Sequence, residues 1–358
     1  MLRRSASDTV VAAPGTFPLE LVAKAYPALR NLIWVVDEGA SHMDWNEVPE
    51  GTGGSVNVAT WQEIVNEAPA ESGKELPSGE TDEPRDVVTF WQGKPGTMEE
   101  MVRFSQKNIV AGVAGVIGGL PMSAKMGPGD VFLPVERMTQ ASTLILTLAA
   151  LHSNATLAIN SVAGKDADVV FAAQGVSPTI LVVPPEGLAR IHADASAQCA
   201  ASTLSAAAHR SLSRTLSDHG VLPSPSSVAA RFNSGLKPPI GKDPSKLRLV
   251  FAADRAGTGA PLLTSKMVSD LRAFLGARFV HGLAAAKVAG LATMGWVHDY
   301  REFGQEVVVG PPTVSCELVL RDSGAHKTED EKVEGEVCVS FPAPDSWLRF
   351  ANSRTRSS

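Results

Sequence analysis

Short apolar segments alternate with longer amphipathic or apolar segments from Asp86 onward, and this alternation most constrains the fold. Runs of aliphatic residues indicate buried strands, and apolar residues every three or four positions indicate helices. The expected strands are 86–91, 130–135, 155–160, 177–183, 246–253 and 277–282. The expected helices are 99–120, 139–154, 165–175, 185–220 and 262–276. Strands alternating with helices at this spacing predict an α/β fold, with parallel sheets flanked by helices.

The two ends of the chain have a different character. A helix over 17–31 precedes a strand at 32–36, and short strands at 306–312, 315–322 and 335–341 predict a small β-rich C-terminal part. The predicted organisation is a flexible N-terminus at 1–16, an α/β region at 17–246, a second α/β segment at 247–341, and a tail at 342–358. Within the α/β region we expect a mobile acidic loop at 37–85 and a proline-rich loop at 220–246.

Composition excludes several classes of function. The formal net charge of −6 argues against a nucleic-acid partner. No apolar stretch reaches the length of about 18 residues typical of a transmembrane span. The three cysteines are far apart and form no metal-binding or disulfide pattern, so we expect no metal site. Arg3 and Arg4 resemble the start of a mitochondrial targeting sequence, but Asp8 argues against one. We expect an intracellular protein, either cytoplasmic or associated with an organelle.

Several segments, in order, resemble the N-terminal region of the adenylate-forming (AMP-binding) superfamily, and within it the long-chain fatty acyl-CoA synthetases. The resemblance runs from about Phe17 to about Phe341. The segments are LELVAKAYPALRNLIWVVDE, QKNIVAGVAGV, GPGDVFLPVERM, ADVVFAAQGVSPTILVVPPEGLARI, LRLVF followed by GTGAPL, and VGPPTVSCELVLRD followed by GEVCV. The resemblance implies the fold of part of that N-terminal domain and an ancestry in ATP-dependent ligation of fatty acids to CoA.

The family's phosphate loop, T-S-G-T-T-G-x-P-K-G, is degenerate in this sequence. Its counterpart is QGKPGTMEEM, in which the retained residue types, shifted in position, are Gly93, Lys94, Gly96 and Thr97. The position of the family's lysine holds Glu100, next to Glu99. A like-charge pair about 4 Å apart costs on the order of 1 kcal/mol in water and more at lower dielectric, so these carboxylates oppose a triphosphate.

Two further motifs lack the polar residues that contact the nucleotide or Mg²⁺ in the family. In the counterpart of Y-G-L-T-E, Gly282 remains, but Ala284 replaces the nucleotide-binding threonine and Ala285 the magnesium-binding glutamate. Alanine cannot bind a hard cation. Arg137 occupies the position of the histidine in L-P-L-A-H-I.

The adenine loop is the best preserved motif. Its matching residues are Gly259, Ala260 and Pro261. The resemblance therefore implies a vestigial nucleotide site at Gly259, Ala260, Pro261 and Gly282, with a degenerate phosphate loop at Lys94, Gly96 and Thr97. It implies no catalytic residue and no Mg²⁺ site, and at most weak ATP or AMP binding. The residues after Phe341 leave no room for the family's ribose-binding aspartate or its C-terminal lysine.

These features predict a pseudoenzyme that binds a protein partner, an active homologue, an acyl group or a nucleotide. An active or partner-completed long-chain fatty acid–CoA ligase is one alternative, and a non-functional fragment is another. Structural interpretations also stand beside the motifs. Gly93 to Thr97 fit an ordinary strand-to-helix turn, Glu99 and Glu100 fit the start of a helix, and His281 fits a histidine at a strand end. The glycines of GVAGVIGG fit close helix packing.

Overall fold

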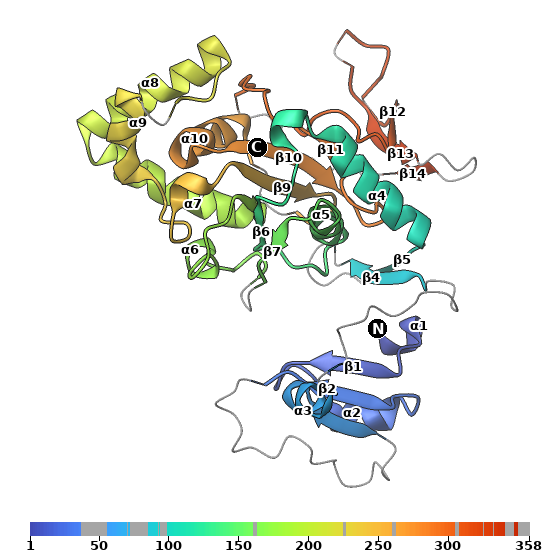
Figure 1. Cartoon of the computed structure of the whole chain (residues 1–358). Coiled ribbons are helices and arrows are strands. Elements are labelled where there is room, and N and C mark those ends of the chain that lie inside the picture. The colour runs from blue at the N-terminus through green and yellow to red at the C-terminus, as the bar shows by residue number, and fades with distance from the viewer. Residues whose placement is uncertain are drawn as a thin grey trace. The chain divides into compact units, whose positions relative to one another are not determined.

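The computed structural model describes residues 1–36, 56–69, 71, 85–91, 93, 99–159, 163–224, 227–259, 263–304, 308–324, 326–331, 333–340 and 347–349. The chain forms two compact units, Met1–Pro84 and Arg85–Ser358 (Figure 1). The division therefore falls at residue 84, and the expected boundary at residue 246 lies inside the second unit. All residues implicated by the sequence in nucleotide handling belong to this second unit.

The first unit is a small parallel sheet with the strand order β1-β2-β3. Its elements are α1 (Leu2–Ser5), β1 (Thr9–Ala12), α2 (Leu19–Ala25), β2 (Asn31–Trp34), β3 (Asn57–Thr60) and α3 (Trp61–Glu67). Its core contains Leu29, Leu32, Trp34, Val56 and Val58.

Two expectations for this unit differ from the structure. Residues 1–16 were expected to be flexible, yet they contain β1, whose Val10 packs against the core of the unit. The expected acidic loop at 37–85 contains β3 and α3. Thr60 caps α3, since its hydroxyl accepts the Glu63 N–H while the Glu63 carboxylate accepts the Thr60 N–H. Elements of four to seven residues are too short for a clear periodic signal.

The second unit is built on a sheet with the strand order β11-β10-β9-β8-β6-β7. Its strands are β6 (Val131–Pro134), β7 (Thr156–Leu157), β8 (Ile180–Val182), β9 (Leu249–Arg255), β10 (Arg278–Ala284) and β11 (Thr293–Met294). All neighbours in this sheet pair in parallel except β10 and β11, which are antiparallel. The predicted α/β class is therefore confirmed, and β9 joins the two segments that we expected to be separate.

Helices cover both faces of this sheet (Figure 1). On one face, α4 (Gln106–Gly119) and α5 (Ala141–His152) accompany a core that includes Phe132, Phe251 and Val280. The opposite face buries the neighbouring strand residues Leu133, Val250 and Phe279, because successive side chains of a strand point to opposite sides. The helices on this side are α6 (Val169–Ala172), α7 (Pro185–Ala200) and α10 (Ser265–Leu275).

Close packing explains the glycines of α4. A Cβ added at Gly112 would lie 2.2 Å from the Ala289 carbonyl oxygen, and one at Gly115 would lie 2.6 Å from the Ser315 hydroxyl. The helix therefore approaches the 289–315 region more closely than any larger side chain allows, which confirms the packing interpretation.

Several boundaries differ from those expected. The strand expected at 86–91 is β4 (Val87–Trp91), but the helix expected at 99–120 begins as a strand, β5 (Glu100–Phe104), which pairs with β4 and is followed by α4. Ser105 starts α4 by accepting the Asn108 N–H at 3.3 Å. The helix expected at 185–220 divides into α7 and α8 (Thr203–His219), because Ser202 caps the second helix. The helix expected at 165–175 shortens to α6. The expected proline-rich loop contains α9 (Val228–Asn233), η3 (Ser234–Leu236) and η4 (Pro244–Lys246).

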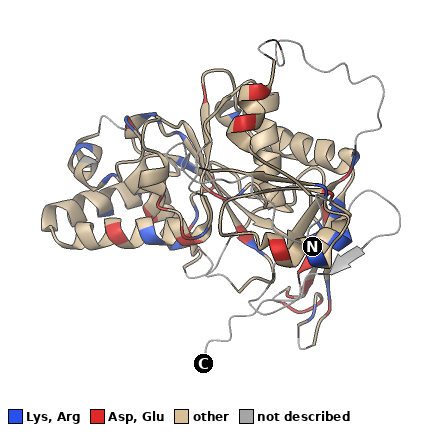
Figure 2. Ribbon diagram, turned by 90° about the horizontal axis from the view of Figure 1, so that it is seen from below, with Lys and Arg blue, Asp and Glu red and all other residues tan. Residues whose placement is uncertain are grey.

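The expected β-rich C-terminal part is an antiparallel sheet. It consists of β12 (Glu317–Arg321), β13 (Glu336–Ser340) and β14 (Trp347–Arg349), in that order. The described part of the expected strand at 306–312 forms no named strand. Among the described residues, no helix combines the length and apolar character needed to cross a membrane. Acidic and basic residues are interspersed along the described ribbon (Figure 2).

Candidate functional site

The carboxyl ends of the parallel strands β6, β8, β9 and β10 meet at one edge of the main sheet. Ligands of open α/β sheets usually bind at such an edge. The charged residues here are Glu136 and Arg137 after β6, Glu186 at the start of α7, and Arg255 at the end of β9. Gly259 follows β9, and Ala284 and Ala285 lie at the end of β10 and directly after it. These candidate positions therefore belong to the same edge of the sheet.

This edge is occupied by the protein's own charges. Arg255 lies 3.7 Å from the Glu186 carboxylate, and the Arg137 Nε donates to the Ala163 carbonyl oxygen at 3.3 Å. Burial raises the pKa of Glu136, partly opposed by the hydrogen bond from the Arg137 N–H and by the charge of Arg255. A cavity of about 10 Å³ lies between Glu136 and Arg255, which is space for about one water molecule.

The phosphate-loop candidates lie outside the described residues. Lys94, Gly96 and Thr97 belong to the segment between β4 and β5, of which Gly93 and Glu99 are described. The segment joins two antiparallel strands, in which Trp91 is paired with Glu100. The expected strand-to-helix turn and the expected helix start at Glu99 and Glu100 are therefore both wrong, because Met101 to Phe104 form ladder pairs with β4.

Glu100 forms an ion pair that the sequence did not suggest. Its Oε1 lies 3.0 Å from the Nζ of Lys287, and both side chains are about half exposed. Lys287 follows the counterpart of the magnesium motif, so residues from the phosphate-loop region and the magnesium-motif region contact each other directly. Ala285, at the glutamate position of that motif, is 1% exposed and packs with Val288, Ala292 and Val339.

The adenine-loop candidates are described only in part. Gly259 adopts a φ of +70°, a left-handed conformation that favours glycine. Ala260 and Pro261 lie outside the described residues. Gly282 has a packing role, because a Cβ there would lie 2.3 Å from the Thr293 carbonyl oxygen of β11. Close packing against β11 therefore accounts for glycine at position 282 without any nucleotide contact.

His281 is buried in the middle of β10, not at a strand end as expected, and its Nε2 has no well-aligned hydrogen-bond partner among the described residues. Its Nδ1 lies 3.2 Å from the Val308 carbonyl oxygen, and its Nε2 lies 2.9 Å from Asp254 Oδ2. Asp254 and His281 are 2% and 5% exposed. They lie on the α10 side of β9 and β10, so the ring is held inside the protein.

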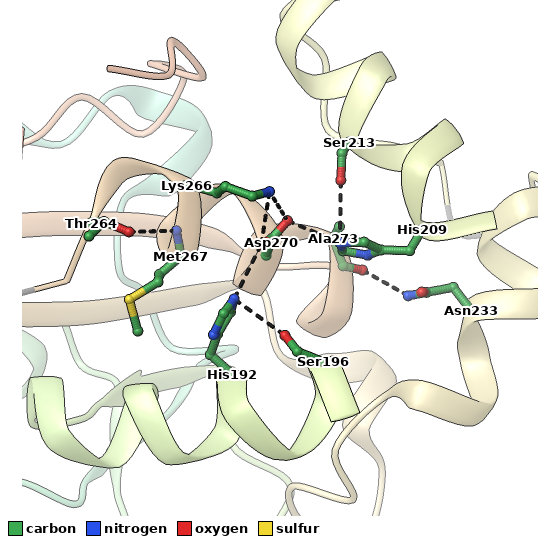
Figure 3. Close-up of polar contacts among 10 residues, drawn as sticks. All are labelled: His192, Ser196, His209, Ser213, Asn233, Thr264, Lys266, Met267, Asp270 and Ala273. Atoms are coloured by element: carbon green, nitrogen blue, oxygen red, sulfur yellow. Dashed lines mark hydrogen bonds and ion pairs between the residues drawn. The ribbon is translucent and has the colours of Figure 1, made fainter. Parts of the chain in front are cut away.

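A second polar cluster, which sequence reasoning missed, joins α7, α8 and α10 around Asp270 (Figure 3). The two oxygens of Asp270 lie 3.2 Å from His192 Nε2 and 3.0 Å from His209 Nε2. Lys266 Nζ lies 3.3 Å from one oxygen. Burial alone would raise the pKa of Asp270, but hydrogen bonds from the two histidines hold it well below its usual range.

The Asp270 cluster does not have the geometry of a hydrolytic triad. Ser196 lies 3.4 Å from His192 Nε2, the same nitrogen that faces Asp270, and Ser213 has the same relation to His209. A triad requires the carboxylate and the hydroxyl on opposite ring nitrogens. No group of acidic, histidine and cysteine side chains suited to a metal ion occurs in the described ranges. The cluster therefore ties three helices together.

No protein-family model matches the sequence, and neither does any curated protein. Solved structures do match. The anthranilate CoA ligase AuaEII in complex with anthranoyl-AMP is 13% identical, with a TM-score of 0.58 over 97% of this chain and 53% of that chain. A benzoate CoA ligase from Burkholderia xenovorans LB400 is 17% identical, with a TM-score of 0.54 over 99% and 55%. The N-terminal domain of FACL13 from Mycobacterium tuberculosis is 13% identical, with a TM-score of 0.55 over 95% and 75%.

These similarities concern the fold, since each of these three identities is below one fifth. The chain spans about half the length of the anthranilate and benzoate CoA ligases. It has the mixed α/β architecture of the N-terminal part of adenylate-forming CoA ligases.

Proposed function

We propose that this chain is a degenerate adenylate-forming ligase-like protein that does not adenylate a fatty acid. Its work is then to bind a protein partner, such as an active homologue, or an acyl or nucleotide ligand. The observation that carries the proposal is the Glu100–Lys287 ion pair. It supports a site in which the groups expected to handle phosphate and Mg²⁺ have been replaced by residues that neutralise one another.

The chemistry of the surrounding residues supports the same proposal. Mg²⁺ is bound through oxygen ligands, and the position of the family's glutamate is the buried Ala285. Glu186 and Arg255 form an ion pair at the carboxyl edge of the sheet, and the buried Glu136 lies beside Arg255. Carboxylates close to a triphosphate raise its energy, since like charges repel more strongly at low dielectric than in water.

The retained features favour binding. Gly259 keeps the left-handed turn of the adenine-loop candidate, and the resembling segments between Gln106 and Phe251 contribute to the buried core of the second unit. The matched structures include ligases of aromatic acids, whereas the sequence resemblance favours a long-chain acyl group. We therefore expect an acyl group or acyl-CoA, with or without AMP bound beside it, to bind more tightly than free ATP.

Thermal unfolding with AMP, ATP and palmitoyl-CoA tests retained binding. A ligand at 100 times its dissociation constant adds about 2.7 kcal/mol of stability, so a binding ligand raises the melting temperature in a saturable way. Substitution of Gly259 by valine should remove a nucleotide-dependent shift, since φ +70° disfavours a β-branched residue. Pyrophosphate release upon addition of palmitate, CoA and Mg²⁺–ATP would contradict the loss of catalysis.

An active or partner-completed ligase is the second candidate, favoured by the lysine and threonine retained at Lys94 and Thr97. In that case these two side chains serve the phosphates. Saturable ATP binding that is lost in Lys94→Ala supports this candidate. ATP binding unaffected by Lys94→Ala counts against it.

A further inference from the structure

A cavity of about 40 Å³ lies along one side of α10. Its helical wall is formed by Ser265, Val268 and Arg272, which follow one face of the helix, and its sheet wall by Phe279 and His281 of β10. The segment from Gly295 to Arg301, together with Val308, completes the lining. The cavity lies partway along β10, beside the edge strand β11, and is separate from the hollow between Glu136 and Arg255.

Arg272 lines this cavity with a buried charge that forms no ion pair with any described residue. Arg272 is only 7% exposed, and its Nε is buried without a hydrogen-bond partner among the described residues. Within the described ranges, no residue hydrogen-bonds or ion-pairs with its guanidinium. The Tyr300 ring, 5.0 Å from Cζ, gives a cation–π contact. Burying a charged group without a counter-ion is expensive, and burial accordingly lowers the pKa of Arg272.

Two acids lie at or near the cavity. Arg301 donates to both oxygens of Asp299, at 2.8 and 2.7 Å, so the charge of Asp299 is matched by Arg301. Asp254 Oδ2 lies 2.9 Å from His281 Nε2, but neither atom has a well-aligned hydrogen-bond partner among the described residues. The Ser265 hydroxyl also has partners, since it donates to the Gly304 carbonyl oxygen and accepts the Phe303 N–H. Among the described residues, the guanidinium of Arg272 therefore has no carboxylate within ion-pair distance, and Asp299 acts on it only at longer range.

We propose that this cavity binds the carboxylate group of a small organic acid, with Arg272 as the charged partner. A planar guanidinium matches the two oxygens of a carboxylate. The volume equals that of about three water molecules, which suits a carboxylate and excludes a nucleotide. Val268, Phe279 and Val308 supply apolar walls, and the half-exposed Trp296 lies at the same cavity, so an aromatic or aliphatic acid fits better than a sugar acid. The proposal is independent of the proposed loss of adenylation.

Calorimetric titration of the full chain with sodium benzoate tests the proposal, with sodium chloride at equal ionic strength as the reference. Saturable binding is expected, weakened at least tenfold in Arg272→Met. The exposed Arg214 of α8 provides the matched control, since Arg214→Met should bind benzoate like the original chain. Asp299→Asn should bind benzoate more tightly, because a carboxylate that lines the cavity loses its charge and Arg301, which also lines it, loses its charged partner.

Three results would overturn the proposal. One is the absence of saturable benzoate binding, and another is equal binding by the Arg272→Met variant and the original chain. The third is preferential binding of inorganic phosphate, which would show an oxyanion site of a different class. Arg272→Met should melt at the same temperature as the original chain, or higher, in the absence of benzoate. If that variant does not fold, unchanged or weaker benzoate binding by Asp299→Asn contradicts the account.

Discussion

Lys287 Nζ lies 3.0 Å from Glu100 Oε1, so the segment after β10 and the start of β5 are joined by a salt bridge. The resemblance places Glu100 at the position of the family's lysine, but no motif singled out Lys287. The contact lets each charge compensate the other.

Breaking this pair should have little effect on stability. Both side chains are about half exposed, and exposed ion pairs contribute less than about 1 kcal/mol. Glu100→Gln and Lys287→Met should each lower the free energy of unfolding by less than that amount. A double-mutant cycle in urea measures the coupling, and a value above about 2 kcal/mol would contradict this view of a solvated pair.

Restoring the family's glutamate at Ala285 should destabilise the protein. The site is 1% exposed and surrounded by Val288, Ala292 and Val339, so Ala285→Glu buries a carboxylate among apolar side chains. We expect a loss of at least about 2 kcal/mol in urea unfolding. Ala285→Ser, a small polar control, should lose clearly less. An unchanged stability for Ala285→Glu would mean that a carboxylate still fits the position.

Substitution by alanine should change the stability of the protein in opposite directions at two glycines of α4, Gly112 and Gly118. Gly112→Ala places a Cβ 2.2 Å from the Ala289 carbonyl oxygen and should cost about 1–3 kcal/mol. Gly118 is the matched control in the same helix, because its added Cβ meets only Val314 Cγ2 at 3.4 Å. Gly118→Ala should be neutral or stabilising by up to about 1 kcal/mol. Equal effects of the two substitutions on urea unfolding would contradict close packing at Gly112.

Asp270 should make stability depend on acidic pH. Its folded-state pKa lies below its usual range, chiefly because hydrogen bonds from His192 and His209 outweigh burial. Its contribution is therefore fully present above the unfolded-state pKa of about 4 and is lost as the pH falls below it. Asp270→Asn should cost about 3 kcal/mol at pH 7, as expected for one member of a buried charge cluster.

The difference between Asp270→Asn and the original chain should shrink as the pH falls from about 5 to 3. Urea unfolding across this range measures it. Asp194→Asn, on the exposed side of α7, is the control and should follow the original chain at every pH. A constant difference between Asp270→Asn and the original chain would show that the carboxylate charge is not the source of the effect.

The strands of the main sheet were predictable because their apolar runs are continuous. Ile180–Val182 and Leu249–Arg255 have neighbours on both sides and helices on both faces, which demands such runs. The β4–β5 hairpin was not predictable from periodicity, since the sequence EMVRF before Ser105 is compatible with a helix. Ala201 ends α7, and the Ser202 hydroxyl caps α8 by accepting the Ser205 N–H, a local signal hidden in a run of alanine and serine.

The charge losses in the candidate site were visible in the sequence, but their compensation was not. Glu100 and Lys287 are far apart in the chain, and only the fold brings them together. The same holds for His192, His209 and Asp270, which lie on three helices. Arg272 looked like an ordinary residue of an amphipathic helix, because no sequence pattern reports a buried guanidinium whose Nε has no partner among the described residues.

Pyrophosphate release by the full chain, in the presence of ATP, Mg²⁺, palmitate and CoA, tests the central claim most directly. The account predicts a rate equal to that of a reaction without protein, for both the original chain and Lys94→Ala. Palmitoyl-CoA added to the same preparation should still raise its melting temperature, which shows that the protein is folded and able to bind. Turnover by the original chain that disappears in Lys94→Ala or Gly259→Val would contradict the account.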